Sequence, residues 1–334
     1  MAIGEKRALI FGVSGQDGTY LAELLKAKDY RVYGTTTSPS SSVKGEVDEV
    51  VTMVLPDSNN VTNLVGEVKP DEIYFLSAVH FSSQSDANKR ANLEQFLSVN
   101  ALSFHDVLKA VQRCSPPTKV FYAASAQVFG VPEQCPQDES CPRRPVTGYG
   151  VSKSLGMDIC RYYREAQNVF VSAGILYNHE SALRPQDFVS TQIVSAAAGA
   201  ALGTGQRLSV RDLDAVADWG AAQDYVRAMW EILQLQRGDD FVIASGEPRA
   251  VREFIAEAYS HVGLDWRSYV ANLGARAVSI RNPYVGNPRK IEAACGWKRS
   301  ISFKELVASL VDSQLRRMSE GAPRSVHARP DGLS

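Results

Sequence analysis

Tyr149 and Lys153 are the two residues whose types and spacing best suit acid–base chemistry. Their four-residue separation places both side chains on one face of a helix, one turn apart. A phenol normally loses its proton near pH ~10, which is too high for a base at neutral pH. Because a neighbouring ammonium group favours the phenolate, the pair predicts a lowered pKa for Tyr149 and proton transfer with an alcohol or ketone. The same spacing is common by chance, so its meaning depends on the elements around it.

A glycine-rich turn near the N-terminus supplies the strongest of those elements. Residues 7–11 form a short apolar run that leads into the pattern Gly-x-x-Gly-x-x-Gly at 12–18, and residues 19–28 follow with leucines at helical spacing. The glycines permit a tight turn and close backbone approach, and the helix N-terminus faces the pyrophosphate of a dinucleotide. We therefore expect NAD or NADP at this turn. The expected contacts are Gly12, Gly15, Gln16, Asp17 and Gly18.

The residues after the second predicted strand, 31–34, leave the choice of cofactor open. An acidic residue there would hold a ribose diol, and an arginine would accommodate a 2′-phosphate. The segment 35–42 contains neither, and Lys44 is the only nearby cation. The sequence therefore predicts only modest discrimination between NAD and NADP. Further candidate cofactor contacts near strand ends are Thr37, Leu76 and Ala78.

Strands and helices alternate along residues 7–177. This alternation predicts an α/β fold with a doubly wound parallel sheet of the Rossmann type. Ligands bind at the carboxyl edge of such a sheet, where we expect His80 and Ser125. Further predicted strands cover 50–55, 72–76, 118–125 and 170–177; predicted helices cover 60–68, 88–111 and the segment carrying Tyr149.

The pattern of predicted strands and helices changes after residue 177. We predict a dinucleotide-binding domain over 1–177 and a smaller, mainly substrate-binding lobe over 178–318, with several short helices and few strong strands. Residues 241–244 are apolar enough to return to the main sheet. The last segment, 319–334, has little apolar content, so we expect a mobile tail.

Composition excludes several classes of function. A net charge of -1 and a pI near 6.5 over 334 residues offer no basic surface for nucleic acid. No apolar run approaches the ~20 residues that span a bilayer, and the N-terminus leads straight into a strand, so we expect neither a membrane segment nor a signal peptide. An odd number of cysteines without CxxC spacing indicates reduced thiols in a cytoplasmic protein, with no metal site. The cysteines are Cys114, Cys135, Cys141, Cys160 and Cys295.

Together these motifs resemble the extended short-chain dehydrogenase/reductase superfamily and, within it, the GDP-mannose 4,6-dehydratase family. The segments that carry the resemblance occur in family order from the first strand to near the C-terminus. They are Gly12-Val13-Ser14-Gly15-Gln16-Asp17-Gly18, Lys69-Pro70-Asp71-Glu72-Ile73-Tyr74, Asn178-His179-Glu180-Ser181, Asp218-Trp219-Gly220 and Gly286-Asn287-Pro288.

The resemblance implies roles for individual residues. Ser125 would hydrogen-bond the sugar oxygen, and Tyr149 and Lys153 would form the proton-transfer pair. His179 and Arg184 would contact the cofactor. A nucleotide-sugar substrate, GDP-linked in the family, would be bound by His80, Ser125, Asn178 and Arg211. The family commonly forms dimers or tetramers, so a homo-oligomer is expected.

One departure from the family changes the expected chemistry. The family has Thr-Ser-Glu where this chain has Ser125-Ala126-Gln127, and that Glu removes the sugar C5 proton during elimination of water. A neutral amide cannot act as this base. Basic residues that the family uses toward phosphate are also replaced, by Ser38-Pro39, Ala217 and Thr191-Gln192.

Three functions therefore remain open from the sequence. The first is hydride transfer at hexose C4, as in 4-ketoreductases and C4 epimerases, without elimination. The second is a 4,6-dehydratase in which another carboxylate, such as Asp138 or Glu139, replaces Gln127. The third is a cofactor-binding sensor without catalysis, although such proteins often lose the Tyr or Lys that this chain keeps.

Overall fold

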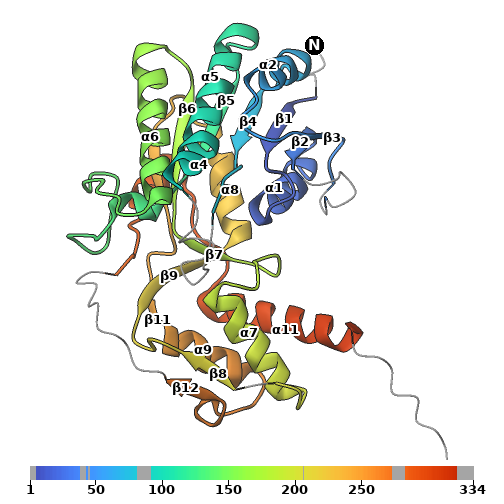
Figure 1. Cartoon of the computed structure of the whole chain (residues 1–334), viewed down its shortest axis with the longest axis vertical. Helices are drawn as coiled ribbons and strands as arrows, with labels where there is room; N and C mark the ends of the chain where they lie inside the picture. Colours follow the sequence, from blue (N-terminus) through green and yellow to red (C-terminus); the bar gives the residue numbers. More distant parts are fainter. Residues whose placement is uncertain are drawn as a thin grey trace, which may run out of the picture.

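The computed structural model describes residues 5–37, 43, 46–80, 92–205, 207–272 and 283–321. A larger lobe contains the main sheet, and a smaller lobe lies beyond the carboxyl ends of its strands (Figure 1). The larger lobe comprises β1 (Arg7–Phe11), α1 (Gln16–Lys26), β2 (Arg31–Thr36), β3 (Glu49–Thr52), α2 (Ser58–Val68), β4 (Glu72–Phe75), α4 (Leu93–Leu97), α5 (Ser103–Cys114), β5 (Lys119–Ser125), α6 (Gly148–Ala166), β6 (Val171–Leu176), α8 (Ala222–Leu233), β10 (Asp240–Ile243) and α10 (Arg289–Cys295).

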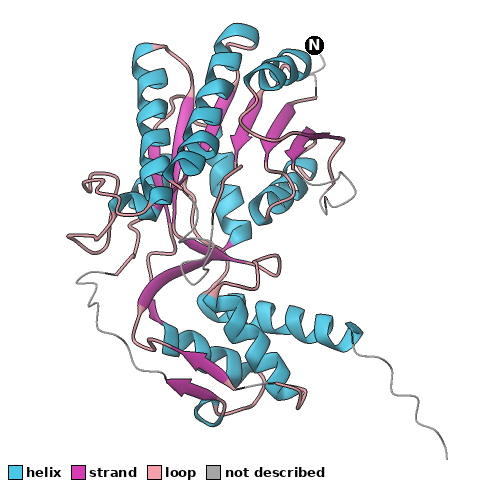
Figure 2. Ribbon diagram, viewed as in Figure 1, coloured by secondary structure: helices cyan, strands magenta, loops and turns pink. Residues whose placement is uncertain are grey.

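The main sheet has seven strands in the order β10-β6-β5-β4-β1-β2-β3, and every pairing within it is parallel. Helices α2, α5 and α6 cover one face, and α1, α8 and α10 cover the other (Figure 2). The strand order reverses between β4 and β1, which creates the crevice where doubly wound folds bind ligands. The predicted Rossmann-type α/β fold is confirmed.

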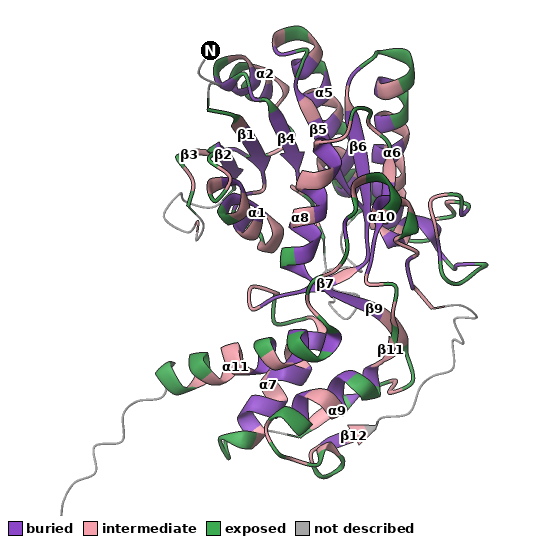
Figure 3. Cartoon of the chain, turned by 180° about the vertical axis from the view of Figure 1, so that it is seen from behind, coloured by how far each residue is buried: buried purple, intermediate pink, exposed green. Residues whose placement is uncertain are grey.

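Burial on both faces explains the apolar character of the strands. In β1, Leu9 and Phe11 pack toward α2 and α5, whereas Ala8 and Ile10 pack toward α1 and α8, and all four are fully buried. A strand with two buried faces has a continuous apolar run instead of alternating polarity. Figure 3 shows the resulting buried layer along the sheet.

The smaller lobe has a core of its own. Trp219 of β9 contacts Phe254 of α9 with ring centroids 5.4 Å apart, and Phe254 contacts Phe303 of α11 at 5.6 Å. One sheet has the order β11-β9-β7, and a second pairs β12 with β8. The elements are β7 (Asn178–Glu180), α7 (Val189–Ala201), β8 (Leu208–Val210), β9 (Val216–Ala221), β11 (Pro248–Ala250), α9 (Val251–His261), β12 (Val270–Asn272) and α11 (Phe303–Gly321).

Some local predictions differ from the structure. The single helix expected over 88–111 is divided into α4, a π-helical turn at Ser98–Leu102 and α5, and residues 88–91 lie outside the described part. Among its described residues, the smaller lobe contains five short strands, which pair across the chain. Helix α11 runs to Gly321, inside the segment expected to be a tail; 322–334 are not described.

Among the helices that the structure describes, none is both long enough and apolar enough to cross a membrane.

Candidate active site

Tyr149 lies in the first turn of α6, where that helix meets the carboxyl edge of the main sheet. Thr147 caps the helix, since its Oγ1 accepts a hydrogen bond from the backbone N–H of Gly150 at 3.0 Å. One turn later, Lys153 is only 1% exposed, and its Nζ donates to the carbonyl oxygen of Ala123 at 2.8 Å. The structure therefore places Tyr149 and Lys153 together, with Nζ 5.6 Å from the centre of the phenol ring.

The pKa of Tyr149 differs from the sequence-based prediction. Burial raises it to about 12, although a hydrogen bond with Ser125 and the charge of Arg184 act in the opposite direction. Burial likewise lowers the pKa of Lys153 to about 7. The expectation that Lys153 would lower the pKa of Tyr149 was wrong, because removal from water disfavours both charged forms. With this pKa, the hydroxyl group of Tyr149 keeps its proton at neutral pH.

Ser125 ends β5 directly beside this tyrosine. Its hydroxyl group hydrogen-bonds Tyr149 and accepts a hydrogen bond from the backbone N–H of Gln127 at 3.3 Å. Gln127 belongs to the short 3-10 turn Ala126–Phe129 that follows the strand. Its Oε1 accepts from the hydroxyl group of Thr147 at 2.9 Å. Ser125, Gln127, Tyr149 and Lys153 thus form one cluster.

The two loop carboxylates considered as substitute bases are bound elsewhere. Glu139 accepts a hydrogen bond from the backbone N–H of Val242 at 2.7 Å, on strand β10. Asp138 accepts from both the backbone N–H and the hydroxyl group of Ser140, at 3.0 and 2.6 Å. Neither carboxylate makes a described contact with Gln127 or Tyr149.

His80 lies against Tyr149, with ring centroids 4.6 Å apart. Its ring also stacks on Phe188, at the start of α7, at 5.7 Å. The backbone before it is held by Asn100, whose side chain accepts from the N–H of Val79 at 2.8 Å and donates to its carbonyl oxygen at 3.1 Å. No motif in the sequence marks Asn100 or Phe188, so neither is among the predicted site residues.

The glycine-rich turn fits a dinucleotide. Gly12 has a φ of +90°, and a Cβ there would lie 3.0 Å from the backbone nitrogen of Ser77. A Cβ at Gly18 would collide with the carbonyl oxygen of Gly12, so the turn closes tightly onto α1. No side chain caps the N-terminus of α1, where Gly15 is the N-cap. Such a helix start can offer its backbone N–H groups to a pyrophosphate.

The side chains at the start of α1, next to this turn, bind β7 and the residue that follows it. Gln16 donates to the carbonyl oxygen of His179 at 3.1 Å and accepts from the hydroxyl group of Ser181 at 2.8 Å. Asp17 contacts Nε2 of His179 at 2.9 Å, and the other ring nitrogen of His179 lies 2.7 Å from the carbonyl oxygen of Tyr177. The Gly-Gln-Asp-Gly and Asn-His-Glu-Ser segments are therefore in direct contact.

This contact is an ion pair when His179 is protonated. Burial lowers the pKa of His179, but the Asp17 carboxylate outweighs it, so the pKa of His179 is raised. Burial raises the pKa of Asp17, but His179 outweighs it, so the pKa of Asp17 is lowered.

The other predicted contacts are dispersed. Arg184 pairs with Glu180 at 3.3 Å and lies over the ring of Phe188, next to His80. Asn178 begins β7 and accepts a hydrogen bond from Tyr225 at 3.5 Å. Thr37 and Ala78 are exposed beside the ends of β2 and β4, and Leu76, also after β4, is partly buried. Arg211 is exposed after β8. That strand lies in the part of the smaller lobe farthest from the main sheet (Figure 1). Lys44 and Ser38-Pro39 lie outside the described residues.

Two other segments of the resemblance hold the lobes together. The Asp218 carboxylate accepts hydrogen bonds from the backbone N–H groups of Ser245, Gly246 and Gly286, at 2.8, 2.9 and 3.3 Å. A Cβ at Gly286 would lie 2.8 Å from the ring of Tyr177. These contacts join β9 of the smaller lobe to the segments after β10 and before α10.

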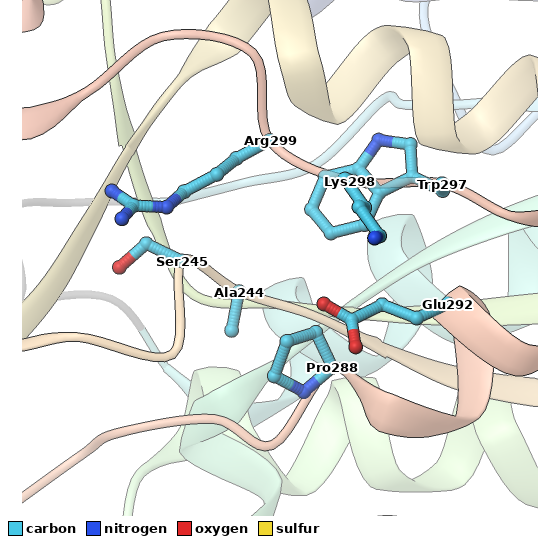
Figure 4. Close-up of a pocket in the computed structure, with 7 residues that line it drawn as sticks. All are labelled: Ala244, Ser245, Pro288, Glu292, Trp297, Lys298 and Arg299. Atoms are coloured by element: carbon cyan, nitrogen blue, oxygen red, sulfur yellow. The ribbon is translucent and has the colours of Figure 1, made fainter.

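A separate hollow of about 220 Å³ lies after β10 (Figure 4). Glu292 and Lys298 point into it from α10 and the segment that follows, and its described lining includes none of the predicted catalytic residues. It is therefore distinct from the cluster around Tyr149.

Comparisons with known proteins agree with this geometry. The GDP-mannose 4,6 dehydratase family profile matches residues 9–310. GDP-mannose 4,6 dehydratase of Dictyostelium discoideum is 33% identical, over 96% of this chain and 99% of its own. RMD from Pseudomonas aeruginosa, solved with NADPH, has a TM-score of 0.76 at 21% identity, covering 93% of this chain and 99% of its own. The UDP-glucose 4-epimerase of Thermus thermophilus, solved with NAD, also has a TM-score of 0.76 at 21% identity, covering 92% and 98%.

Proposed function

Because the chain belongs to the GDP-mannose 4,6-dehydratase family, we propose that it transfers hydride at C4 of a nucleotide-linked hexose without eliminating water. It is an enzyme of the NAD(P)-dependent nucleotide-sugar class. The proposal distinguishes two steps. The cluster around Tyr149 supports oxidation and reduction at C4, but it contains no carboxylate to remove the C5 proton.

Each residue of the cluster has a role in this reaction. When bound at the glycine-rich turn, NAD or NADP supplies or takes up the hydride. Ser125 hydrogen-bonds the C4 oxygen of the sugar, and Tyr149 gives that oxygen a proton as a ketone becomes an alcohol. Lys153 lies one turn behind Tyr149 and, when protonated, favours the phenolate that remains. A pKa of about 12 keeps the proton on Tyr149 at neutral pH, so its hydroxyl group can donate it to the C4 oxygen.

The neutral amide of Gln127 is the observation that carries the proposal. Its oxygen already accepts a hydrogen bond from Thr147, and an amide has no proton acceptor of suitable pKa. A dehydratase would need another carboxylate within reach of C5. The two loop carboxylates considered as substitute bases, Asp138 and Glu139, are engaged by Ser140 and Val242 instead. A sensor without catalysis is less well supported, because Tyr149 and Lys153 are both present.

Product analysis would test this proposal. We expect the protein, given NADH or NADPH, to reduce GDP-4-keto-6-deoxymannose to a GDP-6-deoxyhexose, with loss of nicotinamide absorbance equal to the product formed. The same protein, given GDP-mannose and oxidised cofactor, should yield no 4-keto-6-deoxy sugar. Tyr149→Phe is the control for chemistry at the site. Failure to reduce GDP-, UDP- and dTDP-linked 4-keto sugars, together with dehydration of GDP-mannose, would reject the proposal in favour of a dehydratase.

A further inference from the structure

We propose that Gln127 is a positioning residue, which fixes Ser125 through its backbone and the first turn of α6 through its side chain. The catalytic consequence rests on the proposed function. The structural part does not, because it concerns only contacts between the 3-10 turn Ala126–Phe129 and the start of α6.

The hydroxyl group of Thr147 explains why an acceptor is needed at position 127. Thr147 Oγ1 accepts from the Gly150 N–H at 3.0 Å as it caps the helix. A hydroxyl group has one hydrogen, which remains available for donation once the oxygen accepts this bond. Gln127 Oε1, at 2.9 Å, receives it. The amide oxygen therefore holds the Thr147 hydroxyl group in the orientation that capping requires.

The backbone of Gln127 makes two further contacts with the same region. Its N–H donates to Ser125 Oγ at 3.3 Å, which orients the hydroxyl group that hydrogen-bonds Tyr149. Its carbonyl oxygen packs directly against Gly150, where a Cβ would lie only 2.6 Å away. Because Gly150 has no side chain, the first turn of α6 can approach the 3-10 turn this closely.

These contacts converge on Tyr149, which lies between Thr147 and Gly150 in the sequence. The side-chain bond steadies the turn that carries the phenol, and the backbone bond steadies its hydrogen-bond partner Ser125. Loss of the amide would leave Tyr149 present and chemically unchanged but less well aligned with the sugar oxygen. Misalignment of a catalytic group lowers turnover more than it weakens binding.

Hydrogen exchange on the full-length protein would test the structural part. In Gln127→Met, which has similar length but no acceptor, we expect the first-turn amides of α6 to exchange roughly two- to tenfold faster, as for loss of one neutral hydrogen bond. Thr147→Val should give at least the same change. Gln127→Glu and Thr147→Ser keep the acceptor and the hydroxyl group, so protection should be retained. Gln167→Met is the matched control, because Gln167 bonds Gln112 at the far end of the same helix.

Steady-state kinetics would test the consequence. With GDP-4-keto-6-deoxymannose, Gln127→Met should lower kcat about two- to tenfold while KM and the cofactor Kd stay within about twofold. Thr147→Ser should remain close to wild type. Unchanged exchange in Gln127→Met, or equal loss in Gln127→Glu, would overturn the inference. If the wild-type protein does not reduce the ketone but exchange changes as expected, the positioning contacts stand and only the proposed function fails.

Discussion

Two buried ionisable side chains, Glu72 and Lys153, lie near opposite ends of the main sheet and differ in how many hydrogen bonds they make. Glu72, at the start of β4, is 2% exposed and accepts hydrogen bonds from the hydroxyl groups of Tyr30 and Tyr74 at 2.8 and 2.6 Å. Gln234 and Lys6 also donate to it, at 3.2 and 3.5 Å. Four donors from separate parts of the chain therefore satisfy this carboxylate.

Lys153, near the other end, has much less support. Among the residues that the structure describes, its Nζ donates to one carbonyl oxygen, that of Ala123, and burial lowers its pKa to about 7. A satisfied buried charge stabilises a fold, whereas a poorly satisfied one titrates near neutral pH and is suited to proton transfer. Glu72, at the amino end of the sheet, therefore contributes to stability, whereas Lys153, at the carboxyl end, is suited to chemistry.

The largest effect expected is on turnover at the carboxyl end. Tyr149→Phe removes only the ionisable oxygen, so kcat should fall about 10²- to 10⁴-fold. Cofactor affinity and the free energy of unfolding should change little. Steady-state assay and cofactor titration of the variant would measure both, and near-wild-type turnover would remove Tyr149 from its assigned role.

At the amino end the effect should be on stability alone. Glu72→Ala leaves the hydroxyl groups of Tyr30 and Tyr74 buried without their acceptor, and we expect a loss of ~3 kcal/mol in the free energy of unfolding. Turnover well below the melting temperature should stay near wild type. Urea unfolding would measure the loss, with Glu72→Gln as a milder control. A large fall in kcat for folded Glu72→Ala would break the division between the two ends.

Lys153→Met should change the free energy of unfolding in the opposite direction to Glu72→Ala. Replacing a poorly satisfied buried amine by an apolar side chain should stabilise the fold by ~1–3 kcal/mol while lowering turnover. The pKa of Lys153 is about 7 in the folded protein, below its value in the unfolded chain. The destabilisation that buried Lys153 causes is therefore fully present below pH 7, and it fades as pH rises toward the unfolded value. The difference between variant and wild type in urea should therefore be larger at pH ~6 than at pH ~10. Destabilisation at both pH values would contradict this.

A smaller, pH-dependent effect is expected at the His179–Asp17 pair. The raised pKa of His179 contributes stability that is fully present below its unfolded value near ~6.5 and is lost as pH rises through the folded value. The lowered pKa of Asp17 contributes stability that is lost as pH falls through its folded value, below ~4. Asp17→Asn should thus destabilise the protein most, by about 1 kcal/mol, between these limits. A variant difference independent of pH would mean that the pair is not charged.

The parts of this site that the sequence could predict are those encoded by neighbouring residues. The turn at Gly12 to Gly18 and the Tyr149–Lys153 spacing are local patterns, and the alternation of strands and helices places both at one sheet edge. Asn100 shows the limit of such patterns. It lies in a π-helical turn and holds Val79, and no spacing in the sequence indicates that contact.

Burial explains why the predicted direction of the Tyr149 pKa shift was wrong. Lys153 was expected to lower the pKa of Tyr149, but loss of water is the largest influence on the pKa of each group. The extent of that loss depends on how β5 and α6 pack, which spacing alone does not determine.

NMR of the reaction in heavy water tests the central claim most directly. Elimination across C5 and C6 requires removal of the C5 proton, whereas hydride transfer at C4 breaks no bond to it. With GDP-4-keto-6-deoxymannose and unlabelled NADPH or NADH, we predict a GDP-6-deoxyhexose that carries protium at C4 and keeps its C5 hydrogen. With GDP-mannose and oxidised cofactor, we predict no 6-deoxy product. Ready formation of a 4-keto-6-deoxy sugar labelled with deuterium at C5 by the wild-type protein would contradict the account and require a base other than Gln127.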